Sequence, residues 1–510
     1  MLREHNNYFS QAILKQGAPS LWDLIAFALV VSLLILLAHG AVAMRSPYQI
    51  GEMLSIHLDP AYLPSYALRT VMRMLIALFF SLLLTFTFGT LAAKNRKAER
   101  LIIATVDVLQ SVPVLSFLAM LAPLLIGLFP GTLLGPEFAA IVAIITSQAW
   151  NMILSFYHSV RTVPVHLREV SDVFKLSPWQ RFWRVEVPYA MPSLVWNMMI
   201  SMSASWFFVV ASEAMTVSNQ LITLPGIGSY IALAIAEQNM HAVGYAICSM
   251  FAVIVVYNQL LFRPLHLWSQ KFQSYEEGDE RTERPFIATL FLRSKWLQFF
   301  AEQMDGLWDI FVNWPTRWEY AFKQKPQKRK GLFHFFRSSQ QMFRHVAHLR
   351  DQVKSPWVLR LGRLLYGVIL LVFAGGACLY VARIVAQVLS PEEMLNVLLL
   401  GVYTGLKVMV LIFLCTLVWV PIGVYIGLRP RLSRWCQPAI QLLAAFPANL
   451  IFPVVVYAIV KYHLNGDIWT APLMVLGTQW YILFNVIAGA EAMAKQLLQA
   501  ADSFGLKGWL

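Results

Sequence analysis

The chain has 510 residues, of which 58% are hydrophobic and only 13% are charged. Soluble domains carry about a quarter charged residues, so this composition excludes a soluble globular protein and indicates one that lies within a membrane. The formal net charge of +13 could indicate nucleic-acid binding, but the basic residues are spread over many loops, so we expect no nucleic-acid partner.

About ten apolar stretches reach the length of about 20 residues that a membrane-crossing helix needs. They are residues 24–44, 74–93, 101–129, 138–157, 189–212, 243–262, 364–382, 408–428, 438–460 and 468–490. The first could be read as a signal peptide, but its apolar run is too long for one, and we take it as a retained helix. Because backbone groups in hydrocarbon must be paired within their own segment, the predicted fold class is an all-α polytopic helical bundle.

Basic residues gather in every second loop along the chain. The turn at 94–100, the loop at 158–188 and the connector at 263–360 are rich in Lys and Arg, and the N-terminus at 1–21 carries Arg3 and Lys15. Cytoplasmic loops retain these residues, so the sequence predicts that these segments and the N-terminus face the cytoplasm.

The chain repeats itself. Four positions correspond at an offset of 334, with three identical residues and one basic residue in place of another: Thr70, Arg73, Gly89 and Pro113 match Thr404, Lys407, Gly423 and Pro447. Further on the offset is 330, and Trp150, Asp172, Phe174 and Trp179 correspond to Trp480, Asp502, Phe504 and Trp509. We therefore predict two homologous units, at 22–262 with six helices and at 361–510 with four helices, the second cut short within its loop at 491–510. We expect the sequence to be a fragment.

The loop at 158–188 is polar and precedes another spanning helix, so it is expected to fold at the membrane surface as two short helices. Ser177, Pro178 and Gln180 have the spacing of a reciprocal N-terminal cap with proline at the first helical position. The second helix would then present Trp179 and its neighbouring aromatic residues.

The same loop resembles the Glu-Ala-Ala signature of binding-protein-dependent ABC importer permeases. The pattern is carried by Glu169, Val170 and Ser171, by Lys175 at the glycine position, and by a closing Val187-Pro188. In the second copy Gln499 replaces the glutamate, while Ala500, Ala501 and Gly505 match the family pattern. Lys175 departs from the pattern, since glycine reaches positive φ without cost.

The resemblance implies that this loop couples the permease to an ATPase. Its contact residues would then include the apolar side chains of Phe174, Leu176, Trp179, Phe504, Leu506 and Trp509. It also implies an ATPase dimer and a periplasmic solute-binding protein as partners, and a bacterial inner membrane location within lipid. The chain has no phosphate-binding loop and no catalytic or metal-ligand motif, so we expect no cofactor and ATP hydrolysis on a separate subunit. A secondary transporter or channel without an ATPase is the alternative.

The segment from Trp206 to Glu213, followed by Leu224-Pro225-Gly226-Ile227-Gly228, resembles the nitrate, sulfonate, taurine and bicarbonate branch of these permeases. This implies a small anionic solute. Charged residues near membranes are candidates for a transport path, and here they are Arg69, Arg73, Glu213 and Lys407. For the three basic residues we favour contact with lipid headgroups, and Glu213 could gate the path or cap the glycine-rich segment.

The connector at 263–360 is basic, rich in aromatic residues and partly helical in its periodicity. Basic amphipathic helices lie on anionic membrane surfaces, so we interpret it as a tether on the cytoplasmic leaflet. A small regulatory domain is the alternative.

Overall fold

The computed structural model describes residues 54–217, 220–272, 294–323 and 390–491, with scattered positions between 23 and 48, between 368 and 383, and at 493, 503 and 504. By its internal contacts the chain divides into two compact units. One comprises residues 1–313 and 412–510 and the other residues 314–411, so that the boundaries fall within two helices.

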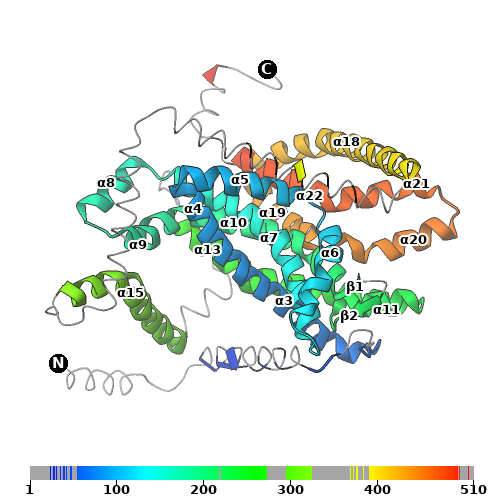
Figure 1. The fold of residues 1–510 in the computed structure, drawn as a ribbon, viewed down its shortest axis with the longest axis horizontal. Helices are drawn as coiled ribbons and strands as arrows, with labels where there is room; N and C mark the ends of the chain where they lie inside the picture. Colours follow the sequence, from blue (N-terminus) through cyan, green and yellow to red (C-terminus); the bar gives the residue numbers. More distant parts are fainter. Residues whose placement is uncertain are drawn as a thin grey trace. The chain divides into compact units, whose positions relative to one another are not determined.

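The described helices of the first half form a bundle (Figure 1). They are η1 (Pro60–Tyr62), α3 (Leu63–Leu84), the π turn η2 (Thr85–Gly89), α4 (Thr90–Lys94), α5 (Arg96–Ser111), α6 (Val114–Gly127), α7 (Leu134–Arg161), α8 (Val165–Val173), α9 (Pro178–Arg181), the π turn η3 (Phe182–Glu186) and α10 (Val187–Glu213). After the hairpin of β1 (Ala214–Val217) and β2 (Gln220–Thr223) come α11 (Ile227–Ala236), α12 (Met240–Tyr257), the π turn η4 (Asn258–Phe262), α13 (Arg263–Ser269) and η5 (Gln270–Phe272).

The second half adds a smaller set of helices. They are α15 (Lys295–Lys323) of the connector, α18 (Pro391–Gly427), α19 (Pro430–Ala445), η6 (Ala448–Leu450), α20 (Phe452–Lys461), α21 (Gly466–Trp469) and α22 (Ala471–Glu491). The start of α18, at 391–411, is the main described part of the second unit, and its side chains are largely exposed.

Helices α3, α7 and α10 form the centre of the bundle. Their contacts bury large side chains completely, among them Met74, Phe156 and Trp206. Small polar residues let α7 and α10 approach closely: the Oγ atoms of Ser155 and Ser193 lie 2.9 Å apart, and serine pairs of this kind are typical of helix contacts in membranes.

Six helices are long and apolar enough to cross a membrane among the described residues, or seven if one bent pair counts as a span. They are Pro60–Lys94, Leu134–Arg161, Pro178–Glu213, Met240–Phe272, Pro391–Gly427 and Leu473–Glu491, and the bent pair is Arg431–Ala445 with Ala448–Lys461. The helical membrane fold is thus confirmed. The predicted stretch 101–129 is two helices, because Val112 and Pro113 are extended between α5 and α6, and most of 24–44 and 364–382 lies outside the described residues.

The two halves share local structure at the predicted offsets. Helix α5 covers 96–111 and α19 covers 430–445, which is 334 residues further on at both ends. Each is followed by an extended residue and a proline, Val112-Pro113 and Phe446-Pro447. These matches support the repeat, which remains a prediction.

A matching glycine contact supports the repeat further. A Cβ on Gly89 would lie 2.9 Å from the Phe156 side chain, and one on Gly423 would lie 2.7 Å from Val486. Gly423 is 334 residues after Gly89, and Val486 is 330 residues after Phe156. Two pairs of helices therefore approach closely at corresponding positions.

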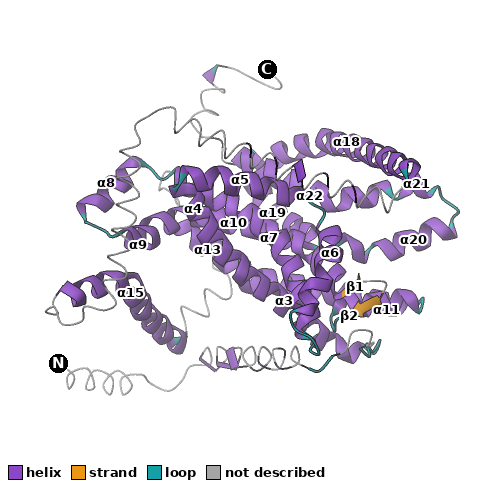
Figure 2. Ribbon diagram, in the orientation of Figure 1, coloured by secondary structure: helices purple, strands orange, loops and turns teal. Residues whose placement is uncertain are grey.

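The bundle has two different ends. Figure 2 shows α8 and α9 leading away from one end, and the only strands of the described residues, β1 and β2, at the other beside α11. The strands pair antiparallel, with Ala214 opposite Thr223. Helix α10 connects the two ends, because α9, η3 and α10 continue as one helical span of 36 residues, about 50 Å long.

Candidate functional site

The loop at 158–188 folds largely as its sequence predicts. Helix α8 ends at Val173, and α9 begins at Pro178 after the Ser177 cap. The predicted reciprocal cap is confirmed: the Gln180 N–H donates to Ser177 Oγ at 3.2 Å, and the Ser177 N–H donates to Gln180 Oε1 at 3.0 Å. The second helix is not a separate short helix, because it continues through η3 into α10.

Lys175 occupies the tight turn between the two helices of this loop. Its φ is +51°, in the left-handed region. That region favours glycine, which the family pattern has at this position. The turn therefore forms in spite of the lysine, at the cost of backbone strain.

One ion pair joins α8 to α9, and hydrogen bonds of Ser171 order the end of α8 and the turn after it. Arg181 of α9 forms an ion pair with Asp172 of α8. The buried Ser171 donates to the Arg168 carbonyl at 2.6 Å, and its own carbonyl accepts from the Leu176 N–H at 3.0 Å. Because α9 runs on through η3, the loop is joined to α10 without a break in the helix.

The corner between α8 and α9 is the exposed apolar part of the loop. Val173 is 78% exposed and Phe174 is 71% exposed. Leu176 is half-buried and Trp179 is 37% exposed, while Glu169 and Val170 are exposed. Of the apolar contact residues that the resemblance implies in this loop, Phe174 is thus the one most open to a partner.

Two further contacts tie the loop end to the bundle. Lys94 of α4 lies 2.7 Å from Glu186 of η3. Glu99 of α5 accepts hydrogen bonds from Tyr157 and Arg161 of α7. The Tyr157 hydroxyl, followed by the Arg161 guanidinium, holds the pKa of Glu99 below its usual value.

In the second copy of the loop, the structure describes only one of the predicted contact residues. Phe504, the counterpart of Phe174, is 81% exposed. The other predicted residues lie outside the described part of the chain, namely Gln499, Ala500, Ala501, Gly505, Leu506 and Trp509.

At the opposite end of α10, a cluster of charged residues is completely buried. Arg73 of α3 donates to both carboxylate oxygens of Glu137 of α7, at 2.5 and 2.7 Å. It also donates to Glu213, the last residue of α10, at 2.6 Å. Glu213 in turn accepts from the Thr70 hydroxyl at 2.6 Å and from the Gly228 N–H at 2.6 Å.

This charge cluster corrects one prediction and decides another. Arg73 has no exposed surface, so contact of its guanidinium with lipid headgroups is wrong. Glu213 caps the glycine-rich segment, which is one of its two predicted roles. The sequence reasoning missed Glu137, although it is the only carboxylate in the apolar helix α7.

The remaining basic candidates lie in different surroundings. Arg69 is half-buried in α3. Lys407, in the second unit, is half-buried with its Nζ 4.6 Å from the centre of the Tyr403 ring. No group of metal-ligating side chains occurs among the described residues.

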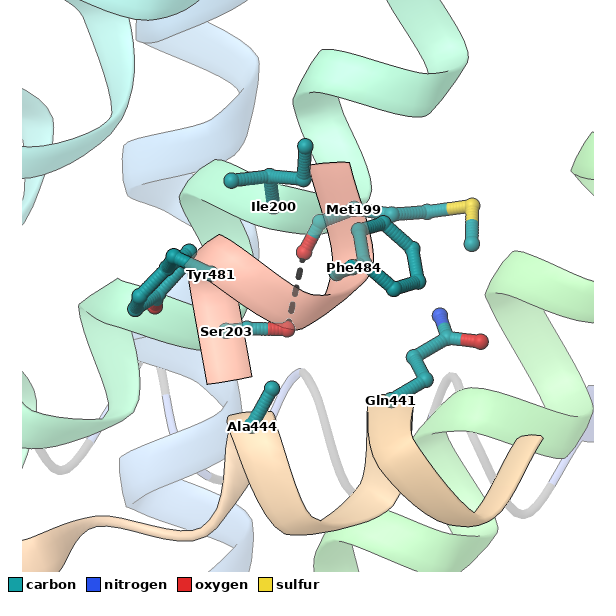
Figure 3. A pocket seen from close by; sticks show the side chains of 7 residues that line it. All are labelled: Met199, Ile200, Ser203, Gln441, Ala444, Tyr481 and Phe484. Carbon is teal, nitrogen blue, oxygen red and sulfur yellow. Dashed lines mark hydrogen bonds between the residues drawn. The ribbon is translucent and has the colours of Figure 1, made fainter. Parts of the chain in front are cut away.

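Figure 3 shows a narrow cavity between the two halves. It is lined by Met199, Ile200 and Ser203 of α10, Gln441 and Ala444 of α19, and Tyr481 and Phe484 of α22. The Ser203 hydroxyl donates to the Met199 carbonyl at 2.9 Å, within α10 itself. Beside the cavity Trp196 stacks on Phe484, with ring centres 4.4 Å apart, so the halves share an apolar contact.

The described residues thus form a helical membrane bundle with a protruding loop that continues into a central spanning helix. Residues 85–263 match the family described as binding-protein-dependent transport system inner membrane component. The predicted resemblance to ABC importer permeases is confirmed by this match, which lies within the first half of the chain.

The chain is also similar to several individual permeases, at modest sequence identity. The chain is 27% identical over 120 residues to the bicarbonate transport system permease protein of Synechocystis, covering 23% of this chain and 41% of that protein. It is 24% identical over 223 residues to the nitrate import permease of Leptolyngbya laminosa, covering 42% and 77%. It is 26% identical over 253 residues to the glycine betaine/proline betaine permease of Escherichia coli, covering 47% and 66%.

Proposed function

We propose that the chain is the membrane-spanning permease subunit of an ATP-driven importer, with the loop at 158–188 as its contact to an ATPase subunit. The observation that carries this proposal is the exposed Phe174 on a rigid loop that continues into α10. A contact that couples the ATPase subunit to the permease needs an apolar side chain that the subunit can bury. It also needs a stiff element that transmits movement of the subunit to the membrane helices. Burial of such a side chain contributes about 1.5–3 kcal/mol.

The repeat supports a symmetric partner. Phe174 and Phe504 are counterparts at the 330-residue offset, and both are largely exposed. An ATPase dimer offers two equivalent docking positions, and two copies of the loop in one chain would fill both. We further propose that both loops lie on the cytoplasmic side with the N-terminus, as the distribution of basic residues indicates, and that a periplasmic solute-binding protein serves the other side.

Crosslinking tests the ATPase contact. The four native cysteines are first replaced, and single cysteines are placed at Phe174 and Phe504 in membranes that contain the candidate ATPase subunit. We expect both to crosslink to that subunit. Leu124, which is 68% exposed on α6, is a matched control at a position with similar exposure and should not crosslink. If neither loop position captures the subunit, the chain is better described as a secondary transporter or channel.

The solute we propose is a small anion such as bicarbonate or nitrate. This rests on the names of the matched permeases, two of which import these anions. Uptake of labelled bicarbonate, nitrate and glycine betaine into vesicles tests the proposal. ATP-dependent uptake of either anion supports it, and uptake of betaine alone contradicts it.

A further inference from the structure

The connector helix α15 packs against the loop at 158–188. Three polar contacts join them, one from each of three residues near the middle of α15. The Trp179 indole N–H donates to the Phe311 carbonyl at 3.2 Å, and the Gln180 amide donates to Asn313 Oδ1 at 2.8 Å. Arg184 lies 3.2 Å from Asp309.

Aromatic rings fill the contact between these hydrogen bonds. Trp183 of η3 lies edge to face against Trp308 and Phe311, with ring centres 5.2 and 5.4 Å apart. Trp179 packs on Phe311 in the same way at 5.2 Å. Edge-to-face pairs of this kind stabilise a contact beyond the area that they bury, and three of them join α15 to the loop.

The same rings continue into the membrane bundle. Trp183 contacts Phe86 of η2 at 5.8 Å, and Phe86 contacts the buried Phe156 of α7 at 5.3 Å. The π turns η2 and η3 meet at this point, and such wide turns are frequent at functional sites. Helix α15 is therefore connected to the core through Trp183.

The contact divides the surface of the loop into two parts. On the α9 side, the Trp179 indole already has its hydrogen-bond acceptor and its aromatic partner in α15. At the corner between α8 and α9, Val173 and Phe174 stay exposed. A partner that docks on the loop can therefore reach Val173 and Phe174 directly, whereas α9 is already in contact with α15.

We propose that α15 is a strap that holds the loop against the bundle, so that the ATPase subunit docks on Val173 and Phe174 and not on Trp179. This inference rests on the proposed function for the identity of the partner. On this proposal, helix α15 of the connector contacts the coupling loop, whereas the sequence alone suggested a connector that lies on the cytoplasmic leaflet. The acidic residues Glu302, Asp305 and Asp309 of α15 also disfavour contact with an anionic membrane surface.

A disulfide tests the strap in the full-length chain. In the cysteine-free background, cysteines replace Gln180 and Asn313, and a photo-crosslinking amino acid replaces Phe174. We expect oxidation of membranes to close the disulfide, and photo-capture of the ATPase subunit at position 174 to stay within about twofold of that in the reduced chain. A pair at Ser155 and Ser193, which touch within the bundle, is the positive control, and a pair at Gln180 and Glu302 is the negative control.

The outcomes separate the strap from the proposed function. Failure of the disulfide at Gln180 and Asn313, with the Ser155 and Ser193 pair closing, overturns the strap even if position 174 captures the ATPase. Loss of capture on oxidation also overturns the proposal, because α15 would then block docking. A disulfide that forms without capture in either state means that the proposed ATPase contact itself is wrong.

Substitutions in α15 provide a second measurement. Trp308→Ala removes a ring that packs on Trp183, and we expect the Gln180 and Asn313 disulfide to form several times more slowly. Leu307→Ala is the neighbouring control, since Leu307 is largely exposed, and its disulfide should form at the parent rate. Equal rates in both variants would show that the aromatic contact does not hold α15.

Discussion

The two ends of the helical span that contains α10 differ in chemistry: one carries buried charges and the other carries exposed apolar side chains. At Glu213 the helix ends among fully buried charges that satisfy one another. At the other end, where the continuous span of α9, η3 and α10 begins at Pro178, there are exposed apolar side chains and partly exposed ion pairs. A buried ion pair fixes geometry because separating its charges in a medium of low dielectric constant is costly, whereas exposed apolar surface gains free energy when a partner covers it. The difference supports the proposal that the loop end is a docking surface, whereas the hairpin end holds α10 in place through its buried charges.

Removing the central cation should have the largest effect. Arg73→Met leaves Glu137 and Glu213 buried together without a counter-charge, and loss of one partner from a buried pair costs about 3–5 kcal/mol. We expect a marked fall in the temperature at which the detergent-solubilised protein loses its monodisperse peak. Arg69→Met, one turn earlier and half-buried, should lower it little. Equal shifts would show that the hairpin end is no more anchored than its surroundings.

A methyl group at Gly228 should disturb the same end by a smaller amount. Its Cβ would lie 2.2 Å from the Val210 carbonyl oxygen and 2.9 Å from Glu213 Oε2. Overpacking of this kind costs about 1–3 kcal/mol. Gly244→Ala in α12 is the control, because no atom lies within 4 Å of its new Cβ and alanine favours a helix by about 0.5–1 kcal/mol. Thermal stability of the two variants should move in opposite directions.

At the loop end, relief of strain at Lys175 should stabilise the protein slightly. A left-handed backbone costs a non-glycine residue about 1–2 kcal/mol, and glycine loses about 0.5–1 kcal/mol through its greater freedom when unfolded. The net gain of Lys175→Gly is therefore on the order of 0.5–1 kcal/mol, measurable as slower proteolysis of the loop. Lys175→Ala keeps the Cβ and should show no gain. A destabilised glycine variant would contradict the strained turn.

The smallest effect should come from the exposed pair at Glu99. Its pKa is lowered in the folded state by Tyr157 and then Arg161, so its stabilisation is present above the unfolded value of about 4.3 and is lost as pH falls through the folded value. Glu99→Gln should remove this part of the acid sensitivity in melting scans between neutral and acidic pH. An unchanged pH profile would mean that water already satisfies the carboxylate.

Much of the fold could be predicted from sequence because its signals are local. Apolar runs mark the spanning helices, and the spacing of Ser177, Pro178 and Gln180 marks a helix start, since each pattern involves neighbours in the chain. Pro113 marks an interruption of the apolar run at 101–129, but hydropathy alone continues across Val112 and Pro113 and does not show that one helix ends there and another begins. Hydropathy reports where a segment lies and not whether its helix is continuous.

The features of the candidate site also fall into those that local sequence predicts and those that depend on helix packing. Composition, hydropathy and cap spacing are enough to predict a helical membrane protein with a capped surface loop, and the resemblance of that loop predicts Phe174 as a contact residue. The folded bundle is needed to see that Arg73 pairs with Glu137 and Glu213, which are 64 and 140 residues away, and that α15 packs against Trp179. Long-range pairings of this kind depend on how helices pack. No local spacing encodes them, because the partners become neighbours only when the bundle has formed.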